Sequence, residues 1–237
     1  MGKSKDLATF FASTGHLSIN NASGSQVTLH RTDTTIANDD LYGQIILSGD
    51  DADTNASGTR GYIRGRSQGS GGGLKMEFGT AGGGVAMGSD PRMTINTDGY
   101  VTNPYQPAFN AKRTSSQSIS GTTTLVFNEV RSNASSSYNS SNGIFTTPVA
   151  GQYIFTFKAL FYPFDTSEYL DLYSYVNSSI RNRYEQTGNG GGHTQIDYTE
   201  VVYLNANDTF KLVATDRNTG SFSMYAHENH FSGRLLG

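Results

Sequence analysis

The chain has 237 residues, of which 35% are hydrophobic and 16% charged, and its net charge is -3 at pH 7. Both fractions are low for a compact soluble protein, so we expect a limited core in each subunit and further burial between subunits. The slightly acidic balance offers no electrostatic case for nucleic-acid binding, which requires clustered Lys and Arg. The chain contains no cysteine, which excludes disulfides and thiolate metal sites.

Glycine and aromatic residues are unequally distributed along the chain. Residues 1–100 hold 18 of the 28 glycines but only 6 of the 27 Phe and Tyr residues. Aromatic side chains supply much of the area that a core buries. We therefore expect a globular domain in residues 101–237 and an N-terminal part that does not fold as a monomer.

Residues 1–15 are expected to form an attachment segment. Leu7, Phe10 and Phe11 belong to a short apolar run that could form one or two helical turns before Gly15. So short a helix is marginal alone, so we expect these three side chains to dock on another protein. No long apolar run follows Met1, and we expect neither a signal peptide nor a transmembrane segment.

Residues 16–101 are expected to form a glycine-rich β-shaft. Short runs alternate apolar and polar residues, with Gly, Asn and Asp between them, which is typical of strands and turns. These runs are residues 17–19, 27–29, 43–47, 61–64, 74–78 and 92–95. Because their apolar faces are thin and a single sheet leaves open edges, we expect three chains to intertwine here.

The end of this region carries a recognisable sequence motif. A glycine-rich stretch, 69–74, is followed by Phe78-Gly79-Thr80 and then by residues 90–101, Asp-Pro-Arg-Met-Thr-Ile-Asn-Thr-Asp-Gly-Tyr-Val. It resembles shaft segments of bacteriophage tail fibres. The motif predicts a strand, a tight turn at Asp98-Gly99 and a second strand.

Residues 102–106 are expected to be a linker, and residues 107–237 a knob. The knob carries motifs in this order: Pro107-Ala108-Phe109-Asn110-Ala111, Val126-Phe127-Asn128-Glu129-Val130, Gly143-Ile144-Phe145-Thr146, Pro148-Val149-Ala150-Gly151, Tyr153-Ile154-Phe155-Thr156-Phe157, Leu204-Asn205-Ala206-Asn207-Asp208 and Phe231-Ser232-Gly233-Arg234-Leu235. It resembles the globular head of the first complement component (subunit q) and the tumour-necrosis-factor superfamily. The resemblance implies a ten-stranded jelly-roll sandwich and a homotrimer, so the whole chain is expected to be all-β.

The number of aromatic residues at strand positions suggests which side chains form the trimer core. A sandwich of this size is expected to be too small to enclose all the aromatics of the knob, so some are expected to face a three-fold axis. The candidates are Tyr153, Phe155, Tyr203 and Phe231.

The resemblance implies that both chain ends of the knob lie at one pole, so the receptor-binding surface is expected at the opposite pole. Four loops are assigned there: residues 114–122, 162–168, 188–193 and 216–221. Loops on a rigid scaffold are where recognition residues concentrate, and these loops combine aromatic faces with bidentate polar groups, as carbohydrate binding requires. The candidates are Tyr162, Phe164, Asp165, Asn189, His193, Asp216, Arg217 and Asn218.

The sequence offers no catalytic or metal constellation. Residues 51–55 start like a calcium loop but lack the glycine and the bidentate Glu of that motif. His227 and His230 are three apart, so on a strand their side chains point to opposite faces. We therefore expect no enzyme activity, no cofactor and no bound metal.

These features together predict a phage tail-fibre protein. A homotrimer made in the host cytoplasm would be anchored to a tail or adaptor protein of the virion by residues 1–15, and its knob would bind a host-surface glycan or protein. The alternatives are a decoration or head-fibre protein of a viral capsid and a bacterial surface trimer. None of these readings involves nucleic acid.

Overall fold

The computed structural model describes residues 22–24, 26–50, 57–82, 90–188, 190, 192–217 and 222–236, and all regular structure in them is β. The chain divides into two units, Met1–Thr102 and Asn103–Gly237. Leu7, Phe10 and Phe11 of the expected attachment segment, the expected strand at residues 17–19, Asn189 and Asn218 lie outside the described residues.

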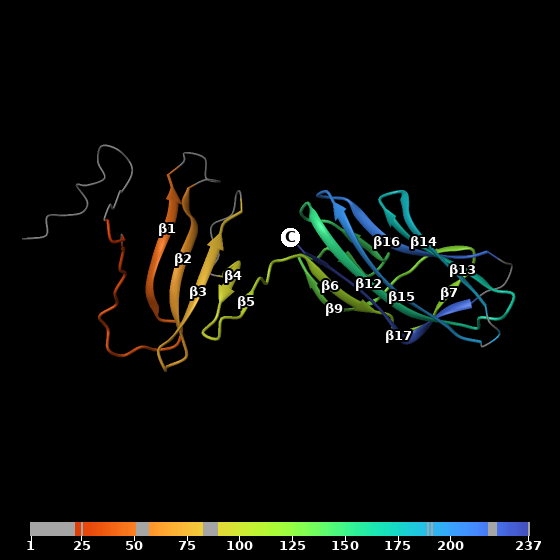
Figure 1. Ribbon diagram of the computed structural model, residues 1–237, viewed down its shortest axis with the longest axis horizontal. Helices are drawn as coiled ribbons and strands as arrows, with labels where there is room; N and C mark the ends of the chain where they lie inside the picture. The colour runs from red at the N-terminus through yellow and green to blue at the C-terminus, as the bar shows by residue number, and fades with distance from the viewer. Residues whose placement is uncertain are drawn as a thin grey trace, which may run out of the picture. The chain divides into compact units, whose positions relative to one another are not determined.

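The first unit is a five-stranded antiparallel sheet in the order β1-β2-β3-β4-β5 (Figure 1). Its strands are β1 Leu41–Gly49, β2 Gly58–Gln68, β3 Gly73–Thr80, β4 Met93–Ile95 and β5 Val101–Thr102. The structure has no strand at residues 27–29, where one was expected. Within the chain, β1 to β5 pair with one another, and the intertwining of three chains stays a prediction.

The expected turn at Asp98-Gly99 joins β4 to β5. Gly99 has a φ of 83°, a conformation that glycine adopts at little cost. The side chain of Asn96 accepts hydrogen bonds from the backbone N–H groups of Asp98 (3.0 Å) and Tyr100 (2.8 Å). An Asn side chain that bonds its own turn in this way fixes the hairpin.

The second unit, the head, is a sandwich of two six-stranded antiparallel sheets (Figure 1). One sheet has the order β15-β12-β17-β6-β9, with β7 paired to β17, and the other has the order β10-β11-β16-β13-β14, with β8 paired to β16. The strands are β6 Ala108–Lys112, β7 Gln117–Ile119, β8 Thr122–Thr124, β9 Glu129–Ala134, β10 Tyr138–Asn139, β11 Ile144–Thr146, β12 Gly151–Tyr162, β13 Tyr169–Val176, β14 Ser179–Thr187, β15 Thr194–Leu204, β16 Thr209–Asp216 and β17 Phe222–Leu235. The described head thus has more strands than the ten expected, because several of them are fragments of two or three residues.

The core of the head is built from aromatic rings. Phe155 stacks on Phe210 of the opposite sheet with ring centroids 3.8 Å apart, and Phe109 meets Phe231 edge to face at 4.9 Å. Edge-to-face and stacked rings are favourable arrangements for aromatic packing. The interior of a single sandwich therefore encloses these aromatic rings.

Three of the four residues expected at a trimer axis lie in this core. Tyr153, Phe155 and Phe231 are each 0% exposed within a single subunit, so they are not available to a neighbouring chain. Alternation along β12 is the reason, since every second side chain from Tyr153 onward points inward and those between point outward. The fourth, Tyr203, is 62% exposed.

Two small residues fit the backbone demands of the head. Asn207, which stands where the family motif has Gly, has a φ of 70°, and Asn tolerates this conformation better than most residues. Gly233 on β17 leaves no room for a side chain, because a Cβ there would lie 2.6 Å from the ring of Phe155.

Candidate functional site

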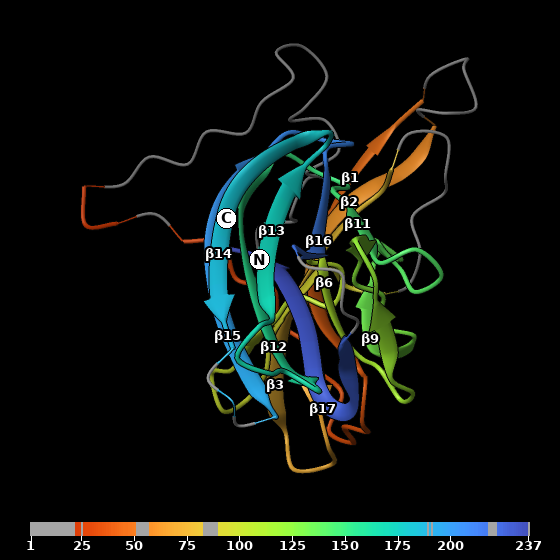
Figure 2. The same ribbon diagram turned by 90° about the vertical axis from the view of Figure 1, so that its right-hand side faces the viewer.

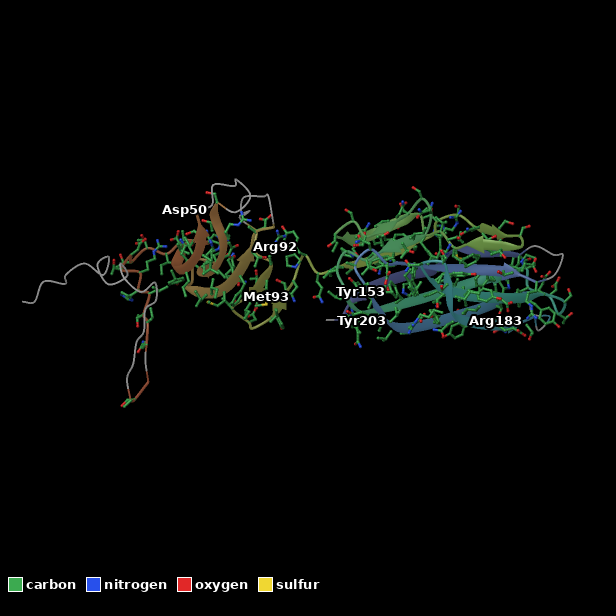
Figure 3. The ribbon with its side chains drawn as sticks, turned by 90° about the horizontal axis from the view of Figure 1, so that it is seen from above. Asp50, Arg92, Met93, Tyr153, Arg183 and Tyr203 are labelled. Carbon is green, nitrogen blue, oxygen red and sulfur yellow. The ribbon has the colours of Figure 1, made fainter. Side chains whose placement is uncertain are left out.

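The strands of the head define two poles. At the near pole, Gly151 pairs with Leu204, and Leu235 donates a backbone hydrogen bond to Pro107 at 3.0 Å, so both chain ends of the head lie here. At the far pole, Phe161 pairs with Thr194 at the other ends of β12 and β15. Figure 2 views the head from its far-pole side, and Figure 3 shows Tyr203 and Arg183 toward opposite ends of the head.

Backbone hydrogen bonds bring the far-pole loops together. Phe164 donates to Gly192 at 3.0 Å and Gly188 donates to Glu168 at 2.9 Å, which joins loop 162–168 to loop 188–193. Asp216 donates to Gly121 at 3.0 Å, which joins the end of β16 to loop 114–122. Segments far apart in sequence thus form one continuous end of the sandwich.

An exposed aromatic cluster lies on this pole. Tyr162 stacks on His193 with ring centroids 4.4 Å apart and planes 25° from parallel, and His193 meets Tyr225 at 6.5 Å. Tyr162 and Tyr225 are 44% and 43% exposed. We call these three residues the aromatic cluster. Tyr225 was missing from the sequence-based candidates, because only the pairing of β17 with β12 brings it to this pole.

A network of charged side chains continues from the far pole along the outer face of β13 and β14. Arg217 bonds Glu185 at 2.7 Å, and Glu185 also pairs with Arg183 at 2.8 Å. Both arginines reach the buried Asp171, Arg183 at 2.9 Å and Arg217 at 3.6 Å. The hydrogen bond to Asp171 raises the pKa of Arg183. We call these four residues the charged network.

The charged network has an aromatic neighbour. The guanidinium of Arg217 lies 5.7 Å from the ring centroid of the exposed Tyr169. An aromatic face beside forked donors and carboxylates can stack on a sugar ring and hydrogen-bond its hydroxyl groups. Of this group, the sequence pointed to Arg217 alone, because cross-strand register decides which residues of β13 and β14 lie next to it.

Other expected far-pole residues are placed differently. Phe164 is 0% exposed and packs edge to face on Phe222 at 5.4 Å, so it supports the loop from inside and is not a contact residue. Asp216 is 5% exposed, also too little for a contact residue, whereas Asp165 is exposed. The pKa of Glu168 is raised, chiefly by burial and then by the nearby charges of Asp216 and Asp165.

The second candidate surface is the outward face of the sheet that contains β12 and β15. It exposes Tyr203 and Val201, and beside them Ile154 is half-buried. A surface cavity of about 300 Å³ opens here between Ile154, Thr156 and Arg234. Flat, partly apolar faces of this kind are suited to burial against another subunit.

No group of three His, Asp or Glu side chains within the described ranges is arranged to hold a metal ion. The same part of the chain contains no helix with the length and apolar content needed to cross a membrane.

The two sheets and their connections define the head as a jelly-roll domain. Residues 108–236 match the model of the C1q domain, and the chain belongs to the C1q domain family. Domains of this kind are generally non-enzymatic, typically form homotrimers and bind receptors.

Solved structures similar to the head include the globular domain of the zebrafish complement 1qA protein, at 19% identity and a TM-score of 0.44, covering 56% of this chain and 98% of that one. The tumour necrosis factor Eiger of S. frugiperda follows at 11% identity and 0.43, covering 56% and 93%. Murine APRIL has 10% identity and a TM-score of 0.43, covering 55% and 99%. A comparison with curated proteins gave no match.

Proposed function

We propose that this chain is the receptor-binding protein of a phage tail fibre, a homotrimer whose far pole binds a host-surface glycan. The observation that carries the proposal is the aromatic cluster beside loops that four separate segments build at the pole opposite both chain ends. A chain held through its N-terminal unit would present this pole to the outside. The charged network supplies hydrogen-bonding groups for the same ligand.

The homotrimer is supported by membership of the C1q domain family and by the exposed sheet face. Tyr203, Val201 and Ile154 would be covered there by the neighbouring subunits. Three copies of the far pole would bind one repetitive surface together, and avidity would raise weak contacts by orders of magnitude.

The virion role extends this proposal to the rest of the chain. Residues 1–15, with Leu7, Phe10 and Phe11, would attach the trimer to a tail or adaptor protein, and the assembled protein would reside in the virion. The support is the apolar run in residues 1–15 and the sequence motif at residues 69–101 that resembles tail-fibre shafts.

Binding of the full-length protein to host cells tests the proposal. Tyr162→Ala and Tyr225→Ala each remove a ring from the aromatic cluster, and a loss of about 1 kcal/mol per site, repeated at three linked sites, predicts an avidity loss of about a hundredfold. The matched control is Tyr105→Ala, which removes a ring of similar exposure, 45%, from the near-pole side.

Equal binding by all three variants would refute the far-pole site. Imaging of the particle separates the alternatives, since density for this protein on the capsid would replace the tail-fibre role with that of a decoration protein. Absence from any particle would leave the bacterial surface trimer.

A further inference from the structure

One face of the sheet in the first unit is apolar from edge to edge. In an antiparallel sheet, residues directly opposite each other share a face. One row runs across four strands, and a second row, beginning at two glycines, runs across all five. The rows are Ile45, Ile63, Phe78 and Met93, and Gly43, Gly65, Met76, Ile95 and Val101.

This face is open to solvent in the isolated chain. Ile45 is 55% exposed, Ile63 42% and Val101 55%. Leu29 approaches the face at Gly43, where its Cβ lies 2.7 Å from the position of an added Cβ. Among the described residues, no second layer of sheet or helix covers the rows. Contiguous apolar patches of this kind are rare on monomers and mark interaction surfaces.

The opposite face of the same sheet has the reverse chemistry. Glu77 is buried and pairs with Arg64 at 2.6 Å, Lys75 at 3.2 Å and Arg66 at 3.6 Å. Neither apolar row contains a charged residue. A sheet with one charged and one apolar face needs a second layer on its apolar side to be stable.

We infer that the apolar face packs against the same face of two further copies of this chain, so that three sheets enclose one core around a common axis. The inference rests on the homotrimer proposed above. Strand β5 ends at Thr102 and β6 begins at Ala108, so a trimeric head would hold three such sheets on short tethers. Short tethers give millimolar effective concentrations, and the identical uncharged faces bring no repulsion to the contact.

This arrangement is distinct from the intertwined shaft expected from the sequence. Each copy keeps the strand pairs β1 to β5 within its own chain, and the copies meet through side chains alone. The residues nearest the axis are those on the central strands, with Ile63 on β2 and Phe78 on β3 directly opposite each other. Ile46 faces away, because it alternates with Ile45 on β1.

The lack of cysteine makes a cross-linking test clean. Full-length Ile63→Cys and Ile46→Cys are each prepared, and disulfide formation between chains is followed under mild oxidation. Ile63 and Ile46 have similar exposure in the monomer, 42% and 47%, and the substitution is the same. We expect Ile63→Cys to cross-link at least about tenfold faster, since only its copies would be held together at the axis.

Equal rates for the two variants in a trimeric protein would overturn the packing of these faces while leaving the trimer intact. A monomeric wild-type protein in analytical ultracentrifugation would instead refute the trimer itself. Protection of the Ile63→Cys thiol from maleimide without cross-linking would overturn the inference too, and would assign the face to another segment of the same chain. Unchanged host binding by Ile63→Cys would keep this test separate from the far-pole site.

Discussion

Gly233→Ala is expected to destabilise the head strongly, although it adds a single methyl group. The new Cβ would lie 2.6 Å from Cδ1 and Cε1 of Phe155 and 2.7 Å from Cε1 of Phe109. Neither ring has room to retreat, because Phe155 is 0% exposed and already stacks on Phe210 at 3.8 Å. Overpacking of a core in this way costs about 1–3 kcal/mol, which corresponds to a fall in Tm of about 5–15 °C for a domain of this size.

Differential scanning calorimetry of the full-length protein would measure this change in the transition of the head. Gly71→Ala is the matched control, because nothing lies within 4 Å of its added Cβ and its φ is not positive. The double variant Gly233→Ala/Phe155→Leu should be less destabilised than the sum of the single variants, since the smaller side chain relieves the clash. A Tm for Gly233→Ala within about 1 °C of wild type would refute the packing described for β17.

Two further predictions concern charged groups. Glu77→Gln leaves Arg64, Arg66 and Lys75 without their shared carboxylate and should lower the free energy of unfolding of the first unit by about 3 kcal/mol, measured by denaturant titration. The control Glu129→Gln, whose side chain is 41% exposed, should lower the free energy of unfolding of the head by less than about 1 kcal/mol in the same assay. Similar losses in the two variants would contradict the buried network. Burial and then Lys158 lower the pKa of His230, which also faces Thr156, Asp197 and Arg131. The folded head disfavours the charged ring of His230. The stability that the neutral ring gives the folded head is therefore complete above the ordinary pKa of 6.5 and is lost as the pH falls below it. Tm should therefore drop more between pH 7.5 and 5.5 in wild type than in His230→Gln, and parallel pH profiles would exclude His230 as the cause.

Alternation and turn chemistry made much of the head predictable. The motifs around Tyr153 and Phe231 place strands and a core in the right parts of the chain, and Asp98-Gly99 marks a true hairpin. Period-two alternation identifies two faces but does not say which of them is buried in the subunit. That is why Tyr153 and Phe155 were expected at an axis, although they fill the sandwich.

The far-pole site was only partly predictable for a related reason. Loop positions follow from strand order, so Tyr162 and His193 could be placed at one pole from the sequence. Whether a loop side chain turns in or out depends on how the loop closes, and Phe164 turns in. Tyr225 and the Asp171–Arg183 pair depend on cross-strand register. That register is irregular between Ala159 and Phe161, whose partners on β17 are Asn229 and Met224.

The placement of both chain ends of the head at one pole has an evolutionary consequence. Within the described part of the chain, β6 to β17 pair among themselves, and the boundary falls between Thr102 and Asn103. A recombination event at that boundary would transfer the complete head without cutting a strand pair, and the loops of the opposite pole could vary without touching the joint. Such a head can be exchanged as one genetic cassette, so the far-pole loops and the first unit can change independently in evolution.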